Sequence, residues 1–241
     1  MANTPALSVL IPFFNEEGNV HPVIDEIHEA LAGIDFEIIC VNDCSADATS
    51  MELAEAKARH PHTVVVLNHV ARRGKSSALF SGLRSARGEW VQLLDGDGQN
   101  DPHDTARLWA EIIAPGAPAR LGIIAGKRNS RNDSGFNGVR RFVLRDDATD
   151  TGCGWKLIRT RAFRDLPYFA SMHRFLPALI KRAGWDVREE LVNDRERLAG
   201  VSKYGFLGRL GAGIFDLIGM FWLTRRGGYG IPAEWNDPRA N

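Results

Sequence analysis

The chain has 241 residues with 30 basic and 30 acidic side chains, so its formal net charge is zero. With 44% apolar and 25% charged residues it has the composition of a globular protein rather than a disordered one. Zero net charge argues against nucleic acid as a partner. The three cysteines form no Cys-x-x-Cys pattern, which favours a reducing compartment and argues against a zinc site.

The first half of the chain alternates between the patterns of buried strands and amphipathic helices. We predict strands at 7–14, 36–41, 63–67, 90–94 and 121–125. We predict helices between them, at 23–31, 49–59, 75–87 and 103–113. This alternation is typical of βαβ units, so we expect an α/β fold with a mainly parallel central sheet flanked by helices. Ligands of such sheets bind beyond the carboxyl ends of the strands.

The pattern changes after Lys127, where residues 128–150 have the composition of a loop. A helix is predicted at 172–183 and a strand at 187–192. Residues 206–223 have helical periodicity and a broad apolar surface, but no stretch reaches the roughly 18 uncharged residues of a membrane span. We interpret 206–226 as a C-terminal interfacial helix lying on a membrane; the alternative is a helix packed on the core. Residues 227–241 form a tail.

The strongest chemical signal is a pair of carboxylates, Asp95 and Asp97, directly after the fourth predicted strand. If the chain leaves the sheet there, both can face one hard cation such as Mg²⁺ or Mn²⁺, which prefers oxygen ligands. Gly96 and Gly98 permit the tight backbone geometry that this requires. The alternative is a simple turn in which Asp and Gly serve only as turn formers.

Polar residues also follow the first two predicted strands. Asp43 ends the second strand, where its carboxylate can accept hydrogen bonds from a base or a ribose, whereas Ser45 or Asp47 is placed to cap the following helix. Asn15 and Glu16 follow the first strand, where they either contact a nucleotide or belong to a solvated loop. We favour ligand contact for Asp43.

Taken together, these motifs resemble the family 2 glycosyltransferases of the GT-A fold, most of all the dolichol-phosphate mannosyltransferase branch. The resemblance spans about residues 6–223 and implies a Rossmann-like GT-A domain in residues 1–205. Its most specific piece is Asp95-Gly-Asp97-Gly-Gln99-x-Asp101-Pro102. The other pieces are Pro12 with Asn15-Glu16, Asn42-Asp43-x-Ser45-x-Asp47-x-Thr49, Arg73-Gly74-Lys75 with Ala78 and Gly82, Gly126-x-Arg128, Asp147-Ala-Thr-Asp150-Thr-Gly152-x-Gly154, Met172-His173-Arg174-Phe175 and Arg197-x-x-Gly200-x-Ser202-Lys203-Tyr204-Gly205.

The resemblance implies a role for each candidate site residue. The donor nucleotide would be bound by Pro12, Asn15, Glu16, Asp43, Lys75 and Asp95. The divalent metal, Mg²⁺ or Mn²⁺, would be held by Asp95, Asp97 and Gln99. The catalytic residues around the phosphates would be Asp97, Arg128, Arg174 and Lys203.

The implied reaction moves a hexose of mannose or glucose type from a GDP- or UDP-sugar to a polyprenyl phosphate, dolichyl or undecaprenyl. The protein would be cytoplasmic, peripheral at the inner face of the membrane. A phosphate acceptor is largely ionised near neutral pH and needs a basic pocket, and direct displacement predicts inversion at the anomeric carbon. The basic residues available for that pocket are Arg128, Arg131, Arg140, Arg141, Arg174 and Lys203.

Two other interpretations are open. A saccharide or protein hydroxyl acceptor would need a carboxylate base, for which Asp147 and Asp150 are the candidates. An inactive nucleotide-sugar-binding homologue is the other, because the 131–147 segment, which should hold the acceptor loop, is shorter than in relatives. Asp194 and Glu196 also stand where the family often has His and Pro, which changes the charge expected around the phosphates.

Overall fold

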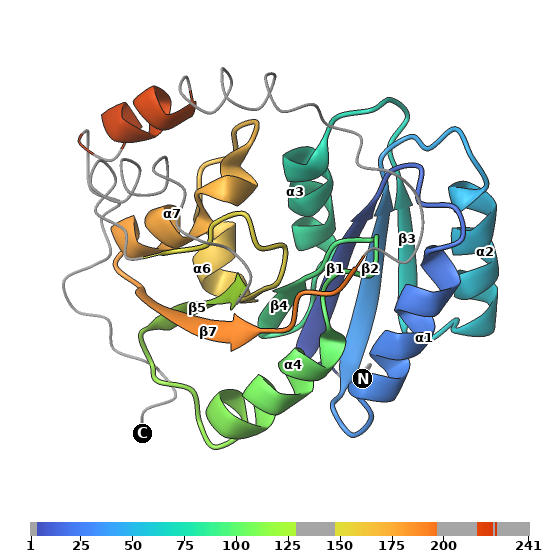
Figure 1. Ribbon diagram of the computed structural model, residues 1–241, viewed down its shortest axis with the longest axis horizontal. Coiled ribbons are helices and arrows are strands. Elements are labelled where there is room, and N and C mark those ends of the chain that lie inside the picture. Colours follow the sequence, from blue (N-terminus) through green and yellow to red (C-terminus); the bar gives the residue numbers. More distant parts are fainter. Residues whose placement is uncertain (1–3, 129–147, 197–215, 224, 226–241) are drawn as a thin grey trace.

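The computed structural model describes residues 4–128, 148–196, 216–223 and 225. Its centre is a seven-stranded sheet in the order β3-β2-β1-β4-β6-β5-β7 (Figure 1). The strands are β1 (Leu7–Phe13), β2 (Phe36–Asn42), β3 (Val64–Asn68), β4 (Trp90–Leu93), β5 (Leu121–Arg128), β6 (Lys156–Arg159) and β7 (Asp186–Val192). Neighbouring strands are parallel except β6, which is antiparallel to both β4 and β5. The predicted mainly parallel α/β sheet is confirmed.

Helices cover both faces of the sheet (Figure 1). One hydrophobic cluster packs the sheet against α1 (Val20–Ala30), α2 (Thr49–Arg59) and α4 (Pro102–Leu108) with its π-helical continuation (Trp109–Ile113). A second cluster packs the opposite face against α3 (Lys75–Ser85), α6 (Thr160–Arg164), the 3₁₀ turn η2 (Met172–Arg174) and α7 (Leu176–Arg182). Successive residues of β1 enter alternate clusters, because side chains point to opposite faces of a strand.

The pairing of β1 determines where the polar strand ends lie. Its neighbours β2 and β4 are both parallel to it, with Phe13 opposite Asn42 and Leu10 opposite Leu93. The loops that follow these three strands therefore leave from the same edge of the sheet. This brings the Asn15, Asp43 and Asp95 loops, which are far apart in the sequence, into one region.

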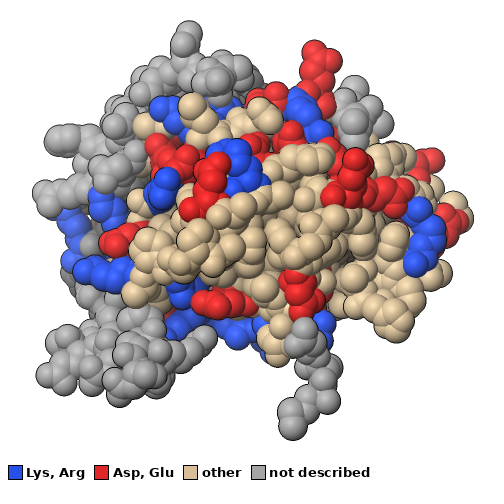
Figure 2. Space-filling view, turned by 90° about the horizontal axis from the view of Figure 1, so that it is seen from below, with Lys and Arg blue, Asp and Glu red and all other residues tan. Residues whose placement is uncertain are grey.

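Some elements differ from the sequence-based prediction. The sequence analysis predicted neither β6 nor α6. β6 has only four residues and contains a lysine, so it lacks the continuous apolar run of a buried strand. The helix expected at 103–113 changes to a π-helix after Leu108, and the helix expected at 172–183 is divided at Phe175. Figure 2 shows acidic and basic side chains interspersed on one face around a broad uncharged area, in keeping with the zero net charge.

Helical residues at 216–223 are the part of the expected interfacial helix that the structure describes. Met220 is buried in the second cluster, and Leu217 and Leu223 pack against it. Ile218 and Trp222 are 62% and 59% exposed. This segment therefore has one face on the core and an apolar face outside it. No helix within the described ranges is long and apolar enough to cross a membrane.

Helix α3 approaches β1 unusually closely. Gly82 faces Leu10, and a Cβ atom built on Gly82 would lie 2.0 Å from the Leu10 Cδ1 atom. Ala78, one turn earlier, is fully buried. Ala78 and Gly82, the two small residues that accompany the Arg73-Gly74-Lys75 motif, therefore allow α3 to pack closely on the sheet. They let the amino-terminal end of α3, which carries Lys75, lie close to the end of the sheet.

We expect Gly82→Ala to lower the free energy of unfolding by about 1–3 kcal/mol, because the added methyl group forces the fully buried Leu10 side chain to shift within a packed cluster. Urea denaturation followed by circular dichroism measures this. Ser85→Ala, at an exposed position of the same helix, is the control and should change it by no more than about 0.5 kcal/mol. An equal effect of both substitutions would contradict the close packing of α3.

Candidate active site

The loop after β4 carries Asp95, Asp97 and Gln99 and is held by its own polar groups. The Asp95 amide donates to Asn100 Oδ1 at 2.9 Å, and the Gln99 amide donates to Asp97 Oδ1 at 3.2 Å. Gly98 has φ +76°, a conformation that suits glycine. The loop is therefore a defined turn that presents two carboxylates within three residues.

Asp95 is the acidic centre of a cluster of basic side chains. The Lys75 ammonium, from the start of α3, forms an ion pair with Asp95 Oδ1. Lys156 from β6 and His173 from η2 also act on it electrostatically. Burial raises the pKa of the Asp95 carboxyl, but Lys75 next to it, with Lys156 and His173, more than reverses this and holds the pKa below its usual value. Asp95 is therefore ionised at neutral pH.

The chemistry of this loop fits a divalent metal. Two carboxylates and an amide oxygen are hard oxygen ligands of the kind that Mg²⁺ and Mn²⁺ prefer. Gly154 lies against this loop, and a Cβ atom there would be 2.4 Å from Asp95 Oδ2 and 2.6 Å from Asn100 Oδ1. The Gln99 side chain donates through Nε2 to the Arg195 carbonyl at 3.3 Å. The assignment of Asp95, Asp97 and Gln99 as metal ligands stays a prediction.

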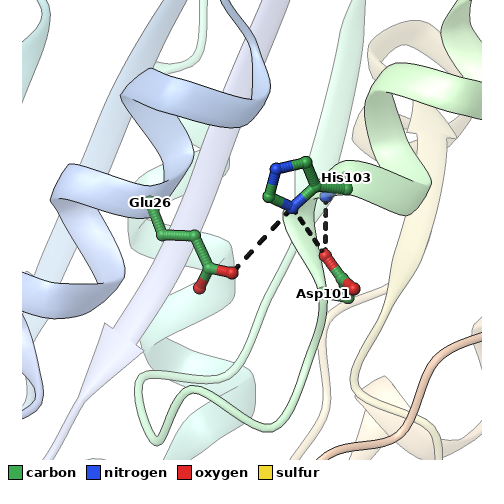
Figure 3. A group of neighbouring side chains, drawn as sticks. All are labelled: Glu26, Asp101 and His103. Atoms are coloured by element: carbon green, nitrogen blue, oxygen red, sulfur yellow. Dashed lines mark hydrogen bonds and ion pairs between the residues drawn. The ribbon is translucent and has the colours of Figure 1, made fainter.

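A different group of potential ligands lies nearby, formed by Glu26, Asp101 and His103 (Figure 3). Their contacts within the chain account for it. Asp101 Oδ1 caps α4 by accepting from the His103 amide at 2.9 Å. Both oxygens of Glu26 accept from the guanidinium of Arg195, at 2.6 and 3.1 Å. A metal here would have to break that bidentate ion pair.

Arg195 ties the Asp95–Asn100 loop to the segment after β7. Its guanidinium also donates to the Asn100 carbonyl at 3.0 Å, and its amide donates to the Gln99 carbonyl at 3.1 Å. Asn100 and Asp194 form an antiparallel bridge beside these contacts. The residues after β7 therefore hold the carboxylate loop through Arg195, and Glu26 of α1 in turn holds the Arg195 guanidinium.

The loops after β1 and β2 bind each other through Asn15 and Glu16. Asn15 Oδ1 accepts from the Ala46 amide at 2.8 Å, and the Asn15 amide donates to Ser45 Oγ at 3.0 Å. The Glu16 amide donates to Thr49 Oγ1 at 2.8 Å. Pro12 lies just before this loop, near the end of β1. The residue in the N-cap position of α2 is Ala48, which makes no side-chain cap bond; Asp47, one residue earlier, accepts through Oδ1 from the amide and the hydroxyl of Thr49.

Asp43 is 3% exposed and accepts hydrogen bonds from three donors of one loop. The Arg73 and Gly74 amides donate to its two oxygens at 2.8 and 2.7 Å, and His69 Nδ1 lies 2.7 Å from Oδ1. Asp43 thus determines where the chain enters α3 and, with it, where Lys75 lies. A contact of Asp43 with a nucleotide stays a prediction, in addition to this structural role.

Arg128, at the end of β5, is already paired. Its Nε and Nη2 donate to the two oxygens of the buried Asp150 at 2.7 and 3.0 Å, and Asp194 lies 3.9 Å from Nη1. The hydrogen bonds that Arg128 donates to Asp150 raise the pKa of the guanidinium. Asp194, where the family often has a histidine, therefore adds negative charge next to Arg128.

His173 and Arg174 lie in η2, beside the start of α3. Ser76 Oγ and His173 Nδ1 are 2.8 Å apart. Burial lowers the pKa of His173 well below its usual value, and Lys75, Lys156 and Arg174 lower it further, so the imidazole is neutral at pH 7. Arg174 is partly exposed next to it. Lys203 and Asp147 lie outside the described residues.

Lys156 is the site residue that the sequence interpretation missed. It is 3% exposed, and its ammonium donates to the Cys153 carbonyl and lies 3.5 Å from the Thr151 carbonyl. It therefore holds the turn that brings Gly154 against Asp95. A lysine within the apolar run 155–158 was the available signal, because such a position predicts a buried charge that needs partners.

A scan against protein families matches residues 8–167 to the model described as glycosyl transferase family 2. The chain belongs to this family. Among curated relatives, it is 29% identical to the dodecaprenyl-phosphate galacturonate synthase of Rhizobium johnstonii, over 91% of this chain and 67% of that one. It is 30% identical to the undecaprenyl-phosphate 4-deoxy-4-formamido-L-arabinose transferase of Pseudomonas fluorescens, over 88% and 64%. The chain thus spans about two thirds of these relatives' length.

Solved structures share the fold. The mannosyltransferase of Pyrobaculum calidifontis in complex with GDP-Man and Mn²⁺ matches with a TM-score of 0.67 at 19% identity, over 94% of this chain and 66% of that one. Glucosyl-3-phosphoglycerate synthase of Mycobacterium tuberculosis, in complex with Mn²⁺, UDP and phosphoglyceric acid, matches with 0.70 at 18%, over 91% and 78%. The predicted GT-A fold and the resemblance to polyprenyl-phosphate glycosyltransferases of family 2 are confirmed.

The buried position of Lys156 predicts a pH effect on stability. Burial lowers the pKa of its ammonium from 10.5 to about 8. Between these values the unfolded chain binds more protons than the folded one, so stability relative to Lys156→Met should rise with pH. The rise should be up to about 3 kcal/mol from pH 8 to 10.5. Urea denaturation of both proteins at each pH measures it.

The exposed Lys181 on α7 provides the control. Lys181→Met should keep a constant difference from the parent chain across the same pH range. A difference for Lys156→Met that stays flat or falls above pH 8 would show that the ammonium is not held in the low-dielectric position the structure gives it.

Proposed function

We propose that the chain catalyses a metal-dependent, inverting transfer of a hexose-type sugar from a GDP- or UDP-linked donor to a polyprenyl phosphate. The observation that carries this is the pair of lysines at Asp95, where Lys75 forms an ion pair with the metal motif and Lys156 acts on it electrostatically. Both partners of the reaction bear phosphates, and such a basic site suits them. The relatives named as dodecaprenyl- and undecaprenyl-phosphate enzymes support the acceptor class.

Asp95, Asp97 and Gln99 would hold Mg²⁺ or Mn²⁺ on the donor diphosphate. A bound divalent cation supplies charge stabilisation to the departing nucleoside diphosphate. The complexes of similar folds with Mn²⁺ and a nucleotide support this assignment. The chain's own contribution is to fix the carboxylates: Asn100 holds the Asp95 backbone, and Arg195 holds the rest of the loop.

A phosphate acceptor fits the cations that the described part of the site offers. A phosphate monoester is already an anion near neutral pH and can attack the anomeric carbon without losing a proton. A hydroxyl acceptor would need a carboxylate base. Of the two candidates, Asp150 accepts through both its oxygens from Arg128, and Asp147 lies outside the described residues. Attack on the face opposite the leaving diphosphate inverts the anomeric carbon, so an α-linked donor would give a β-linked product.

We propose that residues 206–226 hold the chain at the cytoplasmic face of the membrane, where a polyprenyl phosphate is found. The part that is described supports this. Helical residues 216–223 turn Ile218 and Trp222 outward, while Met220 anchors the helix to the core. The Arg225 guanidinium lies over the Phe221 ring, 4.3 Å from its centroid. An amphipathic surface with aromatic and basic side chains is typical of interfacial helices.

Transfer is tested with purified protein, Mn²⁺, a short polyprenyl phosphate and, in turn, GDP-mannose, UDP-glucose and an activated galacturonic acid. Mass spectrometry should detect a lipid-phosphate sugar with one donor. Asp97→Ala should lower the rate at least about 100-fold, because charge on the leaving group loses its counter-ion. Asp165→Ala, at an exposed position after α6, should keep the parent rate. Full activity of Asp97→Ala, or transfer in excess chelator, would refute metal dependence.

Membrane association is tested by co-sedimentation with vesicles that contain phosphatidylglycerol. The double variant Ile218→Ser, Trp222→Ser should bind about tenfold more weakly or worse, because the apolar area available for burial in the lipid is lost. Met51→Ser removes a side chain that is 60% exposed on α2 and should leave binding unchanged. Equal binding of all three proteins would place the contact elsewhere.

A further inference from the structure

The ion pair between Lys75 and Asp95 places a cation on a carboxylate that the family motif assigns to the metal. The two residues come from different elements, Lys75 from the first position of α3 and Asp95 from the loop after β4. About a third of each side chain is exposed, so the pair lies at the mouth of the site rather than in the core. A cation approaching from solvent therefore meets it directly.

Both ends of this pair are fixed by buried contacts. On one side, Asp43 accepts from the Arg73 and Gly74 amides, immediately before Lys75. On the other side, Asn100 Oδ1 accepts from the Asp95 amide, and Gly154 packs against the Asp95 carboxylate. Backbone contacts on both sides therefore place the ammonium next to the carboxylate. In this the pair differs from an ion pair between two long side chains on a protein surface.

A divalent cation and the Lys75 ammonium would repel each other strongly if both stayed on Asp95, and the nearby Lys156 ammonium adds to this repulsion. Lysine is suited to move away. Its charge sits on a flexible four-carbon stem with three rotatable donors, so the ammonium can exchange one anion for another while the backbone stays fixed.

We propose that Lys75 is the resident counter-ion of Asp95 in the donor-free protein, leaves Asp95 when the metal binds, and then pairs with the diphosphate that arrives with the metal. This inference rests on the proposed metal-dependent function. Lys75 is then a positioning residue for the empty site and a phosphate ligand in the filled one. It adds to the proposed function an order of events: the metal binds weakly until a diphosphate is present to receive the ammonium.

The consequence is a coupling between metal and nucleotide. Metal alone has to displace Lys75 and leaves the ammonium without an anion. When the metal binds together with a nucleoside diphosphate, the diphosphate becomes the new anionic partner of the Lys75 ammonium. Because coupling is reciprocal, the metal must also strengthen binding of the nucleotide by the same factor. Direct contact between metal and diphosphate adds to the coupling, so the test has to isolate the share that depends on Lys75.

The experiment measures free Mn²⁺ by its electron paramagnetic resonance signal during titration of the full chain, alone and with saturating GDP or UDP. Lys75→Met keeps the stem and removes the charge. It should bind Mn²⁺ alone about tenfold more tightly than the parent chain, and its gain in affinity from the nucleotide should be about tenfold smaller. Lys75→Arg should bind Mn²⁺ alone as weakly as the parent. Lys181→Met, which removes an exposed lysine of α7, should match the parent in both titrations.

The sign of the change in Mn²⁺ affinity separates the outcomes. If Lys75→Met binds Mn²⁺ alone with equal or lower affinity, while the parent binds it with nucleotide, the counter-ion role is overturned and the proposed function stands. The same conclusion follows if Lys75→Met unfolds while Lys75→Arg binds Mn²⁺ alone more tightly than the parent. If the parent binds no Mn²⁺ even with GDP or UDP, both the inference and the proposed metal dependence fail.

Discussion

The parallel pairing of β2, β1 and β4 is the constraint on which the site depends. Because the three strands are adjacent and run in the same direction, the loops that follow them leave from one edge of the sheet. Each loop carries an acidic side chain: Glu16, Asp43 or Asp95. Carboxylates gathered in this way would repel one another if nothing opposed them.

The structure opposes this repulsion with a different partner for each carboxylate. Glu16 Oε2 accepts from the Asn19 side chain, Asp43 accepts from backbone amides, and Asp95 pairs with Lys75. The partners of Asp43 and Asp95 are consecutive in the chain, because the loop that Asp43 holds leads directly into Lys75. One buried hydrogen-bonding centre, Asp43, thereby positions the cation that neutralises the other carboxylate, so the positions of Asp43 and Asp95 are linked.

Much of the fold could be predicted because its signals are local. Strands buried on both faces leave continuous apolar runs, and the polar residues that end them are visible in the sequence, so β1, β2 and β4 were found within one or two residues. β6 could not be found in this way. It inserts antiparallel between β4 and β5, a pairing decided by residues more than 30 positions away, and its first residue is a lysine that only tertiary contacts make tolerable.

In the candidate site, too, the residues with local sequence signals could be predicted, whereas the contacts between residues distant in the chain could not. The residue types at the strand ends pointed to Asp43, Asp95 and Asp97, and the resemblance added Lys75 and Arg128. What the sequence could not provide was their pairing. Lys75 is 20 residues from Asp95 in the chain, Lys156 and His173 are further from it still, and only the tertiary fold brings them together. Asn15 and Glu16, expected at the ligand, are seen to join two loops through backbone and side-chain hydrogen bonds.

The segment after β7 shows how a departure from the family pattern changes the electrostatics. Arg195 closes the carboxylate loop against α1, while its neighbour Asp194 lies 3.9 Å from Arg128. Arg128 therefore faces two carboxylates, since Asp150 already holds it through two hydrogen bonds. A phosphate that binds Arg128 has to replace the longer contact with Asp194 and leave the bidentate one in place. The guanidinium would then remain oriented by Asp150, and its attraction for the phosphate would be weaker than that of an arginine without acidic neighbours.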